Sequence, residues 1–193
     1  MSINGDNYDV YVVNSAGGVP ELFTSEASDE VQPSWSRDGR WLYFGSDRTG
    51  RLEIWKKPVE GGEAIQITRN GGVLSYESDD GRFLYFAKAA ARGMGQGVWR
   101  IPVEGGEETL VVPQVSWLRW TLLGSNIAYV NAVHRPRPTF EILNPTTGVL
   151  WRHDVPESTP SPDYLSVSPD ERWILYSATE PLASDIMLVD NYR

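Results

Sequence analysis

Basic side chains gather in three segments of the sequence in which acids are nearly absent. Residues 45–52, 87–97 and 131–139 together hold six Lys or Arg residues and one acid, although the whole chain has a formal charge of −9. Arginine is suited to bidentate contact with carboxylate or phosphate groups. We therefore expect a positively charged surface that binds an acidic peptide, a partner protein or an anionic ligand. The candidate partner-binding residues are Arg48, Arg51, Lys88, Arg92, His134, Arg135 and Arg137.

A second interpretation of the same charges needs no partner. Charged loop side chains are commonly solvated or paired with nearby acids. Glu26, Asp29 and Glu30 lie in another expected loop and could neutralise some of the basic residues. Both interpretations remain open from the sequence.

The residue patterns of common catalytic sites are absent from the sequence. There is no GxSxG motif, no Cys, and neither His134 nor His153 stands in a metal-binding HExxH context. The adjacent acids at 79–80 and 170–171 are expected to form turns rather than an acid–base pair. We therefore predict no enzyme activity, no catalytic residues, no metal site and no cofactor.

The positions of these residues follow from a repeat. The apolar runs WLYF, FLYF, IAYV and WILY begin at residues 41, 83, 127 and 173, which are 42–46 residues apart. A second pattern, exemplified by IWKKPVEGG at 54–62 and VWRIPVEGG at 98–106, has the same period. A repeat of 40–45 residues composed of short strands is typical of propeller blades. The fold class we expect is all-β: a β-propeller of four-stranded antiparallel blades, with four blades plus an extra strand.

Each repeat is expected to contain four strands joined by tight turns. Asp38-Gly39 and Gly61-Gly62 are hairpin signals, because Gly accepts the positive φ of such turns. The third repeat has Leu-Gly-Ser at 123–125 and the fourth has Asp170-Glu171 instead, so these two turns are expected to be looser. In the first full repeat, the expected strands are residues 31–36, 41–45, 52–58 and 64–68.

The aromatic residues are expected to pack between blades. Runs such as 41–44 and 83–86 are apolar on both faces, which is typical of strands buried on both sides. Blades stacked face to face provide that environment, so we expect every Trp to pack between blades. The alternative is a Trp-lined ligand site.

The repeats predict one domain covering residues 1–193, but the first and last blades are incomplete. A partial blade at 8–24 precedes blades at about 31–68, 73–112, 115–154 and 164–190, and the last lacks a fourth strand. Open edge strands invite pairing with other chains. The N-terminal strand could complete the last blade, the repeats could be part of a larger ring, or two chains could pair as a homo-oligomer.

Charge and hydropathy limit the partners. A net charge of −9 argues against nucleic acid or an anionic membrane as a partner of the whole surface. No apolar run is long enough to span a membrane, and no signal peptide is visible. The compartment stays open between cytoplasm and periplasm, depending on any parent protein.

The pattern S-x-D-G-x-x-L-Y-F, followed by I-W-x-x-P-V-x-G-G-E, resembles the TolB-like (WD-like) bacterial β-propeller repeat. The likeness is strong over 31–112 and returns at 166–179. The ending at 184–193 is most similar to the C-terminal propeller part of winged-helix transcriptional regulators. No winged helix is present here, so DNA binding is not carried over.

The resemblance implies a non-catalytic protein-interaction or sensing module, expected to be the C-terminal part of a larger bacterial protein. Related propellers also accompany hydrolase domains in peptidases. An accessory propeller that gates a hydrolase is therefore one alternative, and a carbohydrate-binding propeller that uses exposed Trp is another.

Overall fold

The computed structural model describes residues 7–88, 96–116, 118–132, 138–155, 162–179 and 184–189. These residues form strands joined by turns and loops, and they contain no helix. None of the described segments could therefore cross a membrane as an apolar helix.

The strands form five antiparallel sheets in chain order, which confirms the predicted all-β propeller class. The N-terminal hairpin is β1 (Tyr11–Val12) and β2 (Glu21–Leu22). Sheet 1 is β3 (Glu30–Trp35), β4 (Trp41–Ser46), β5 (Glu53–Pro58) and β6 (Ile65–Gln66). Sheet 2 is β7 (Ser75–Glu77), β8 (Phe83–Ala87), β9 (Val98–Pro102) and β10 (Thr109–Val112). Sheet 3 is β11 (Trp120–Leu123), β12 (Asn126–Asn131), β13 (Thr139–Leu143) and β14 (Leu150–Asp154). Sheet 4 has three strands, β15 (Pro162–Val167), β16 (Ile174–Thr179) and β17 (Ser184–Val189).

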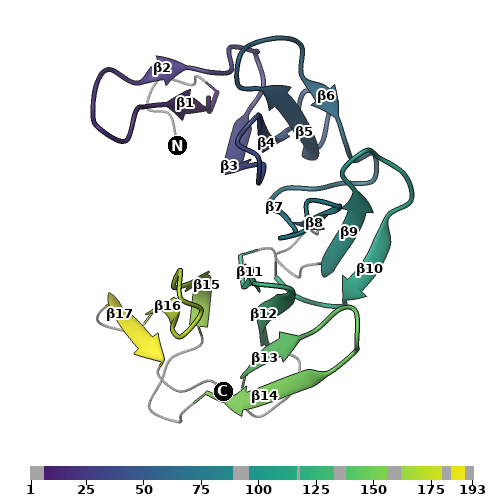
Figure 1. Cartoon of the computed structure of the whole chain (residues 1–193), viewed down its shortest axis with the longest axis vertical. Coiled ribbons are helices and arrows are strands. Elements are labelled where there is room, and N and C mark those ends of the chain that lie inside the picture. The colour runs from purple at the N-terminus through teal and green to yellow at the C-terminus, as the bar shows by residue number, and fades with distance from the viewer. Residues whose placement is uncertain are drawn as a thin grey trace.

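The sheets follow one another along an arc that does not close (Figure 1). Strands β3, β7, β11 and β15 line its inner side, where β3 contacts β7 and β11 contacts β15. Among the described residues, β17 pairs only with β16, and β2 pairs only with β1. The alternative in which the strand at residues 21–24 completes the last blade is therefore wrong for this structure, because that strand, β2, pairs with β1.

The hydrophobic core lies between successive sheets. Tyr43 and Ile54 of sheet 1 pack with Leu84, Phe86 and Ile101 of sheet 2 in one buried cluster. Two further clusters join sheet 2 to sheet 3 and sheet 3 to sheet 4. Each sheet between two others is covered on both faces, which explains why the apolar runs do not alternate with polar residues.

The turn between the first two strands of a sheet is held by equivalent Ser, Asp and Arg residues in sheets 1, 2 and 4. In sheet 1, the Ser36 hydroxyl donates to Asp38, and Asp38 accepts hydrogen bonds from Arg40. These hydrogen bonds lower the pKa of Asp38 to about 2, and the bond from the backbone N–H of Arg40 has the largest effect. The equivalent residues are Ser78, Asp80 and Arg82 in sheet 2 and Ser168, Asp170 and Arg172 in sheet 4. In sheet 4, Arg172 donates to Asp170 through its backbone N–H.

Asp80 and Asp170 are thus turn formers, as predicted. The expectation of looser third and fourth turns is wrong. In sheet 3, β11 and β12 pair as far as Leu123 and Asn126, so a two-residue turn joins them. Glu171 adopts the positive φ that Gly39 and Gly81 adopt, so the hydrogen bonds of the turn are kept at the cost of backbone strain.

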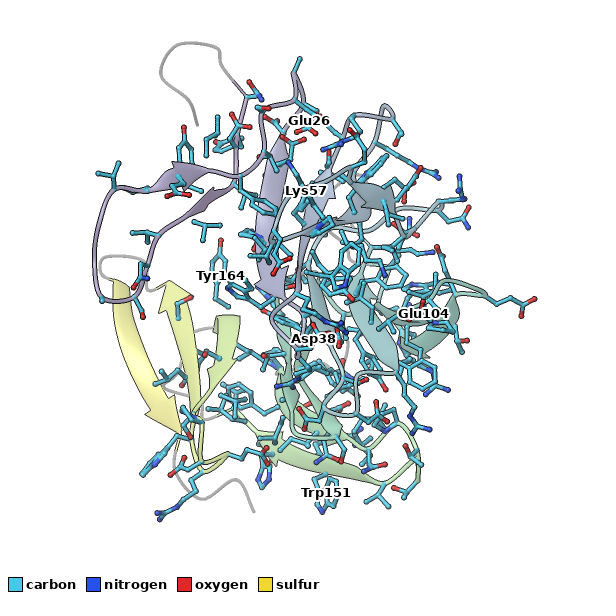
Figure 2. All side chains as sticks on the ribbon, turned by 45° about the horizontal axis from the view of Figure 1, so that its top comes forward. Glu26, Asp38, Lys57, Glu104, Trp151 and Tyr164 are labelled. Carbon is cyan, nitrogen blue, oxygen red and sulfur yellow. The ribbon has the colours of Figure 1, made fainter. Side chains whose placement is uncertain are left out.

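The described tryptophans range from fully buried to half-exposed. Trp120 is 1% exposed and packs between sheets 2 and 3. Trp35 and Trp151 are 52% and 45% exposed, so the expectation that every Trp packs between blades is wrong for these two. Trp151 lies on the outer strand β14, at the edge of the molecule in Figure 2. Trp117 lies outside the described residues.

Candidate functional site

The N-terminal hairpin repeats the outer half of sheet 1. The Thr24 hydroxyl accepts a 2.8 Å hydrogen bond from the Val10 N–H and donates to Asp9. The Thr68 hydroxyl likewise accepts a 2.8 Å hydrogen bond from the Ile54 N–H and donates to Glu53. The hairpin is therefore equivalent to β5 and β6, without counterparts of β3 and β4 among the described residues.

The missing inner strands explain why Trp35 is exposed. Trp35 pairs with Leu42 on β4, and Leu42 pairs with Lys57 on β5, so the three side chains share one face of sheet 1. Lys57 donates a 2.8 Å hydrogen bond to the carbonyl of Phe23 in the hairpin, which shows that this face is turned to the hairpin. Leu42 is buried, but no inner strand from the described part of the hairpin covers Trp35.

The hairpin has large apolar side chains on its other face. Tyr11 pairs with Leu22, as Trp55 pairs with Gln66 in sheet 1. Because side chains alternate along a strand, Tyr11, Val13 and Leu22 lie opposite the buried Val10. All three are exposed, and we call them the apolar end face.

The predicted binding residue Arg48 holds the connection between the hairpin and sheet 1. Its side chain is 18% exposed, and its guanidinium forms ion pairs of 3.3 Å with Glu26 and Glu30. The guanidinium carbon also lies 4.5 Å from the ring centroid of Trp55. Burial acts to raise the pKa of Glu26, but the hydrogen bond from the Ser25 N–H and the charge of Arg48 outweigh it and lower the pKa. The charge of Arg48 is therefore neutralised within the protein.

Arg51 and Lys88 are both paired with acids, and Lys88 also lines a second feature, a groove between sheets 1 and 2. The Arg51 guanidinium pairs with Glu53 at 2.6 Å and also donates to the carbonyl of Arg69. Lys88 pairs with Glu108 at 2.5 Å, and its ammonium lies 3.9 Å from the ring centroid of Trp99. Both basic residues thus have acidic partners, as the second interpretation of the charges expects.

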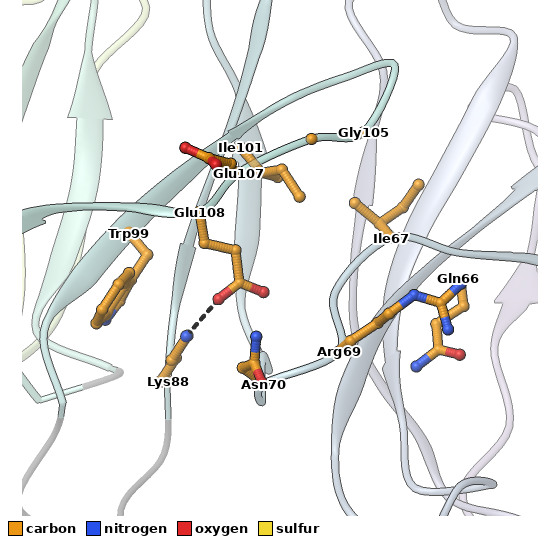
Figure 3. Close-up of a pocket in the computed structure, with 11 residues that line it drawn as sticks. Gln66, Ile67, Arg69, Asn70, Lys88, Trp99, Ile101, Gly105, Glu107 and Glu108 are labelled. Atoms are coloured by element: carbon orange, nitrogen blue, oxygen red, sulfur yellow. Dashed lines mark hydrogen bonds and ion pairs between the residues drawn. The ribbon is translucent and has the colours of Figure 1, made fainter.

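The groove has a volume of about 810 Å³ and runs between the outer strands of the two sheets (Figure 3). The Lys88–Glu108 pair lies in it, with side chains 6% and 11% exposed. The wall from sheet 1 consists of Gln66, Ile67, Arg69 and Asn70. The wall from sheet 2 consists of Lys88, Trp99, Ile101, Gly105, Gly106, Glu107 and Glu108.

The remaining predicted binding residues are Arg92, His134, Arg135 and Arg137. They lie outside the described residues, so the positively charged surface stays a prediction. Of the three predicted residues that the structure describes, Lys88 lines the groove, and Arg48 and Arg51 do not. Sequence reasoning missed Arg69, Asn70 and Glu108. For Glu108, the sequence contains one signal. The first repeat has Ala64 at the equivalent position after the Gly-Gly turn, so an acid at 108 is a departure from the repeat.

Comparison with known proteins identifies the repeat. The family model of the TolB beta propeller domain matches residues 1–111, which is more than half of the chain. The chain belongs to the TolB β-propeller family. An uncharacterised protein of Agrobacterium fabrum, Atu1656, is 38% identical to this TolB-type chain over 61 residues, 32% of the chain and 21% of the relative.

Two solved structures share the fold of the TolB-type chain. TolB from Acinetobacter baumannii superimposes with a TM-score of 0.76 at 22% identity, over 94% of this chain and 46% of TolB. The second comes from an analysis of two prolyl endopeptidases and superimposes with a TM-score of 0.71 at 13% identity. That match covers 98% of this chain and 31% of the peptidase.

The TolB-type chain spans less than half of the A. baumannii TolB and about a fifth of the Agrobacterium relative. Both structural likenesses show the fold alone. The more specific expectation, a particular similarity to winged-helix regulators, finds no support in these likenesses.

Proposed function

We propose that this TolB-type chain is a non-catalytic protein-interaction module that binds a partner through the N-terminal hairpin. The half-exposed ring of Trp35, beside an edge strand with no inner neighbour, is the observation that carries the proposal. Exposed apolar surface next to an open strand edge is typical of a protein-binding site.

The pairing of strands within sheet 1 supports a specific kind of partner. In sheet 1, β5 is covered on its inner edge by the apolar strand β4, which pairs with it along its whole length. Because β1 is the equivalent of β5, its inner edge is suited to a similar strand. The partner is therefore a β-hairpin with an apolar strand, added to β1 by backbone hydrogen bonds and covering Trp35.

The partner can be tested with a probe taken from this chain. A synthetic peptide of residues 29–47 contains the β3–β4 hairpin and should bind the whole chain saturably in fluorescence anisotropy. Tyr11→Pro should abolish binding, because Val10 already directs its backbone groups to β2 and the Tyr11 N–H therefore lies on the open edge. Trp35→Ser should weaken binding.

A control separates this site from other exposed apolar residues. Leu110→Ser changes an exposed apolar residue on the outer strand β10 and should leave peptide binding unchanged. If the unmodified chain does not bind the peptide, or if Tyr11→Pro binds it equally well, the proposed edge is not a binding site.

The mass in solution tests whether the partner is a second copy. Self-association through β1 would give a dimer or larger ring in size exclusion with light scattering, and Tyr11→Pro would return it to a monomer near 21.6 kDa. A monomer that still binds the peptide would indicate that the partner is another polypeptide.

The likeness to a prolyl endopeptidase favours a second candidate, an accessory propeller beside a hydrolase domain. That peptidase was studied for inter-domain dynamics in catalysis and specificity, and this chain covers 31% of it. The candidate requires a catalytic domain in the same polypeptide or in a tightly bound partner. Sequencing the gene on both sides of the encoded 193 residues would establish whether such a domain is joined to it.

A further inference from the structure

The groove between sheets 1 and 2 contains polar groups that its own residues do not satisfy. Glu108 points into the groove, with one carboxylate oxygen on Lys88 and the other turned to the wall from sheet 1 (Figure 3). That second oxygen accepts no hydrogen bond from the part of the chain that the structure describes. Within the same residues, the side-chain amide of Asn70 neither donates nor accepts one. These groups are available to a ligand.

The ion pair in the groove is not a requirement of the repeat. Extending the register of β9 and β10 places Glu108 opposite Ile101. The equivalent position is Ala64 in sheet 1 and Trp151 in sheet 3. Because a buried ion pair contributes little net stability, its presence in sheet 2 but not at the same position of sheets 1 and 3 calls for another explanation.

The charges of the groove balance. Arg69 and Lys88 are basic, Glu107 and Glu108 are acidic, and all four line the groove. A ligand with a net charge would meet one repulsive charge for each attractive one. A neutral ligand that both donates and accepts hydrogen bonds fits this set better.

The polar groups are complementary to hydroxyl groups. The free oxygen of Glu108 accepts, the guanidinium of Arg69 donates, and Asn70 does both. Gln66 donates its amide N–H to the Thr68 carbonyl, which leaves its oxygen as an acceptor. Ile67 and Ile101 provide apolar walls, against which the C–H faces of sugar rings can pack.

We propose that the groove between sheets 1 and 2 binds a neutral oligosaccharide through Glu108, Asn70 and Arg69. Its volume of about 810 Å³ lies within the range of small-molecule sites and accommodates a few sugar rings. The groove is separate from the N-terminal hairpin, so this proposal does not depend on the partner-binding proposal.

Isothermal titration of the whole chain with tetra-N-acetylchitotetraose, a neutral tetrasaccharide, tests the proposal. Saturable binding is expected, and Asn70→Ala and Arg69→Ala should each weaken it by about tenfold, because each removes hydrogen bonds to the ligand. Both side chains are exposed, so these variants should fold. Glu108→Gln should also weaken binding, and its unfolding curve would report any loss of stability.

Matched controls distinguish a site from general affinity. Glu104→Gln alters an exposed acid outside the residues that line the groove and should leave binding unchanged. The deacetylated, cationic form of the same tetrasaccharide should bind less well than the neutral form.

Three results would overturn the proposal. The first is that tetra-N-acetylchitotetraose shows no saturable binding. The second is that Asn70→Ala and Arg69→Ala leave its binding unchanged, and the third is that the cationic form binds more tightly. The last result would assign the groove to a basic ligand such as a Lys- or Arg-rich peptide.

Discussion

The hydroxyl of Tyr43 on β4 donates a 2.9 Å hydrogen bond to Glu77 on β7, across the boundary between sheets 1 and 2. Burial, followed by the charge and hydrogen bond of Glu77, raises the pKa of Tyr43 above its usual value. A second polar contact crosses the same boundary, where Lys56 donates a 3.1 Å hydrogen bond to the carbonyl of Val103. Polar contacts thus fix the relative position of sheets that the apolar cluster holds together.

Tyr43→Phe should lower the free energy of unfolding by about 1–3 kcal/mol, because it removes a hydrogen bond to a carboxylate and keeps the ring. Urea unfolding followed by circular dichroism measures the loss. Tyr164→Phe is the matched control, since Tyr164 is exposed and should change stability little. Equal effects of the two substitutions would show that the bond to Glu77 contributes nothing.

Gly97→Ala should destabilise the protein more than Gly50→Ala. Both glycines have φ near +90°, which costs a side chain about 1–2 kcal/mol. A Cβ on Gly97 would also lie 2.2 Å from the backbone oxygen of Val112, whereas a Cβ on Gly50 would meet nothing within 4 Å. Thermal unfolding of the two variants measures the extra destabilisation caused by the close contact at Gly97, because the backbone strain is the same at both positions. Equal Tm values would contradict the prediction.

Glu141→Gln should lower the free energy of unfolding at neutral pH and should also reduce how much that free energy falls as the pH is lowered. Burial acts to raise the pKa of Glu141, but hydrogen bonds from Tyr129, Arg152 and Asn131 outweigh it, so the pKa is lowered. A lowered pKa means that the stabilisation is present above the ordinary carboxyl pKa and is lost as pH falls through the folded-state pKa.

The variant should therefore lose about 1–3 kcal/mol at pH 7 and show a smaller further decrease between about pH 5 and pH 3. Urea midpoints across this range measure both effects. The control is Glu63→Gln, which alters an exposed acid. An unchanged acid dependence in Glu141→Gln would contradict the prediction.

Arg48→Gln should loosen the N-terminal hairpin, because it leaves the buried carboxylate of Glu30 without its ion pair. Hydrogen exchange should accelerate at the amides of Phe23 and Glu30, whose N–H groups donate to the carbonyls of Val10 and Tyr8. Arg40→Gln, in an exposed turn, should not change these rates. Unchanged exchange rates in Arg48→Gln would show that the ion pair with Glu30 does not hold the hairpin in place.

The predicted positively charged surface now depends on the residues outside the described part of the chain, since Arg48, Arg51 and Lys88 have acidic partners. Replacing Arg92, Arg135 and Arg137 together with Ser should abolish binding of a poly-glutamate peptide by the whole chain. Replacing Arg37, Arg40 and Arg82, which lie in turns between the first two strands of sheets, removes the same charge elsewhere. Equal effects of the two sets would exclude a specific surface.

The repeat could be predicted in detail because its signals are local. A tight turn needs residues that accept its backbone angles, and Asp38-Gly39 and Asp80-Gly81 supply them within a few residues of the strands they join. The apolar runs at 42–44 and 84–86 are buried in the structure because strands of that composition are stable only when covered on both faces.

The candidate sites could not be predicted in the same way. Arg48 belongs to an expected loop, and nothing near it in the sequence shows that Glu30 and Trp55 will enclose its charge. The groove joins Asn70, which follows sheet 1, to Glu108 in sheet 2, and neither residue belongs to a motif.

The sequence by itself thus determined the strands, their turns, their antiparallel order and the burial of the apolar runs, since these follow from interactions between neighbours in the chain. Only the tertiary structure decided which faces stay uncovered. Trp35 is exposed because, among the described residues, the hairpin beside it has no inner strands. Lys88 is paired because the structure brings Glu108 to its ammonium group. Exposure and charge neutralisation depend on which sheets meet, and this arrangement arises only when the sheets pack along the arc.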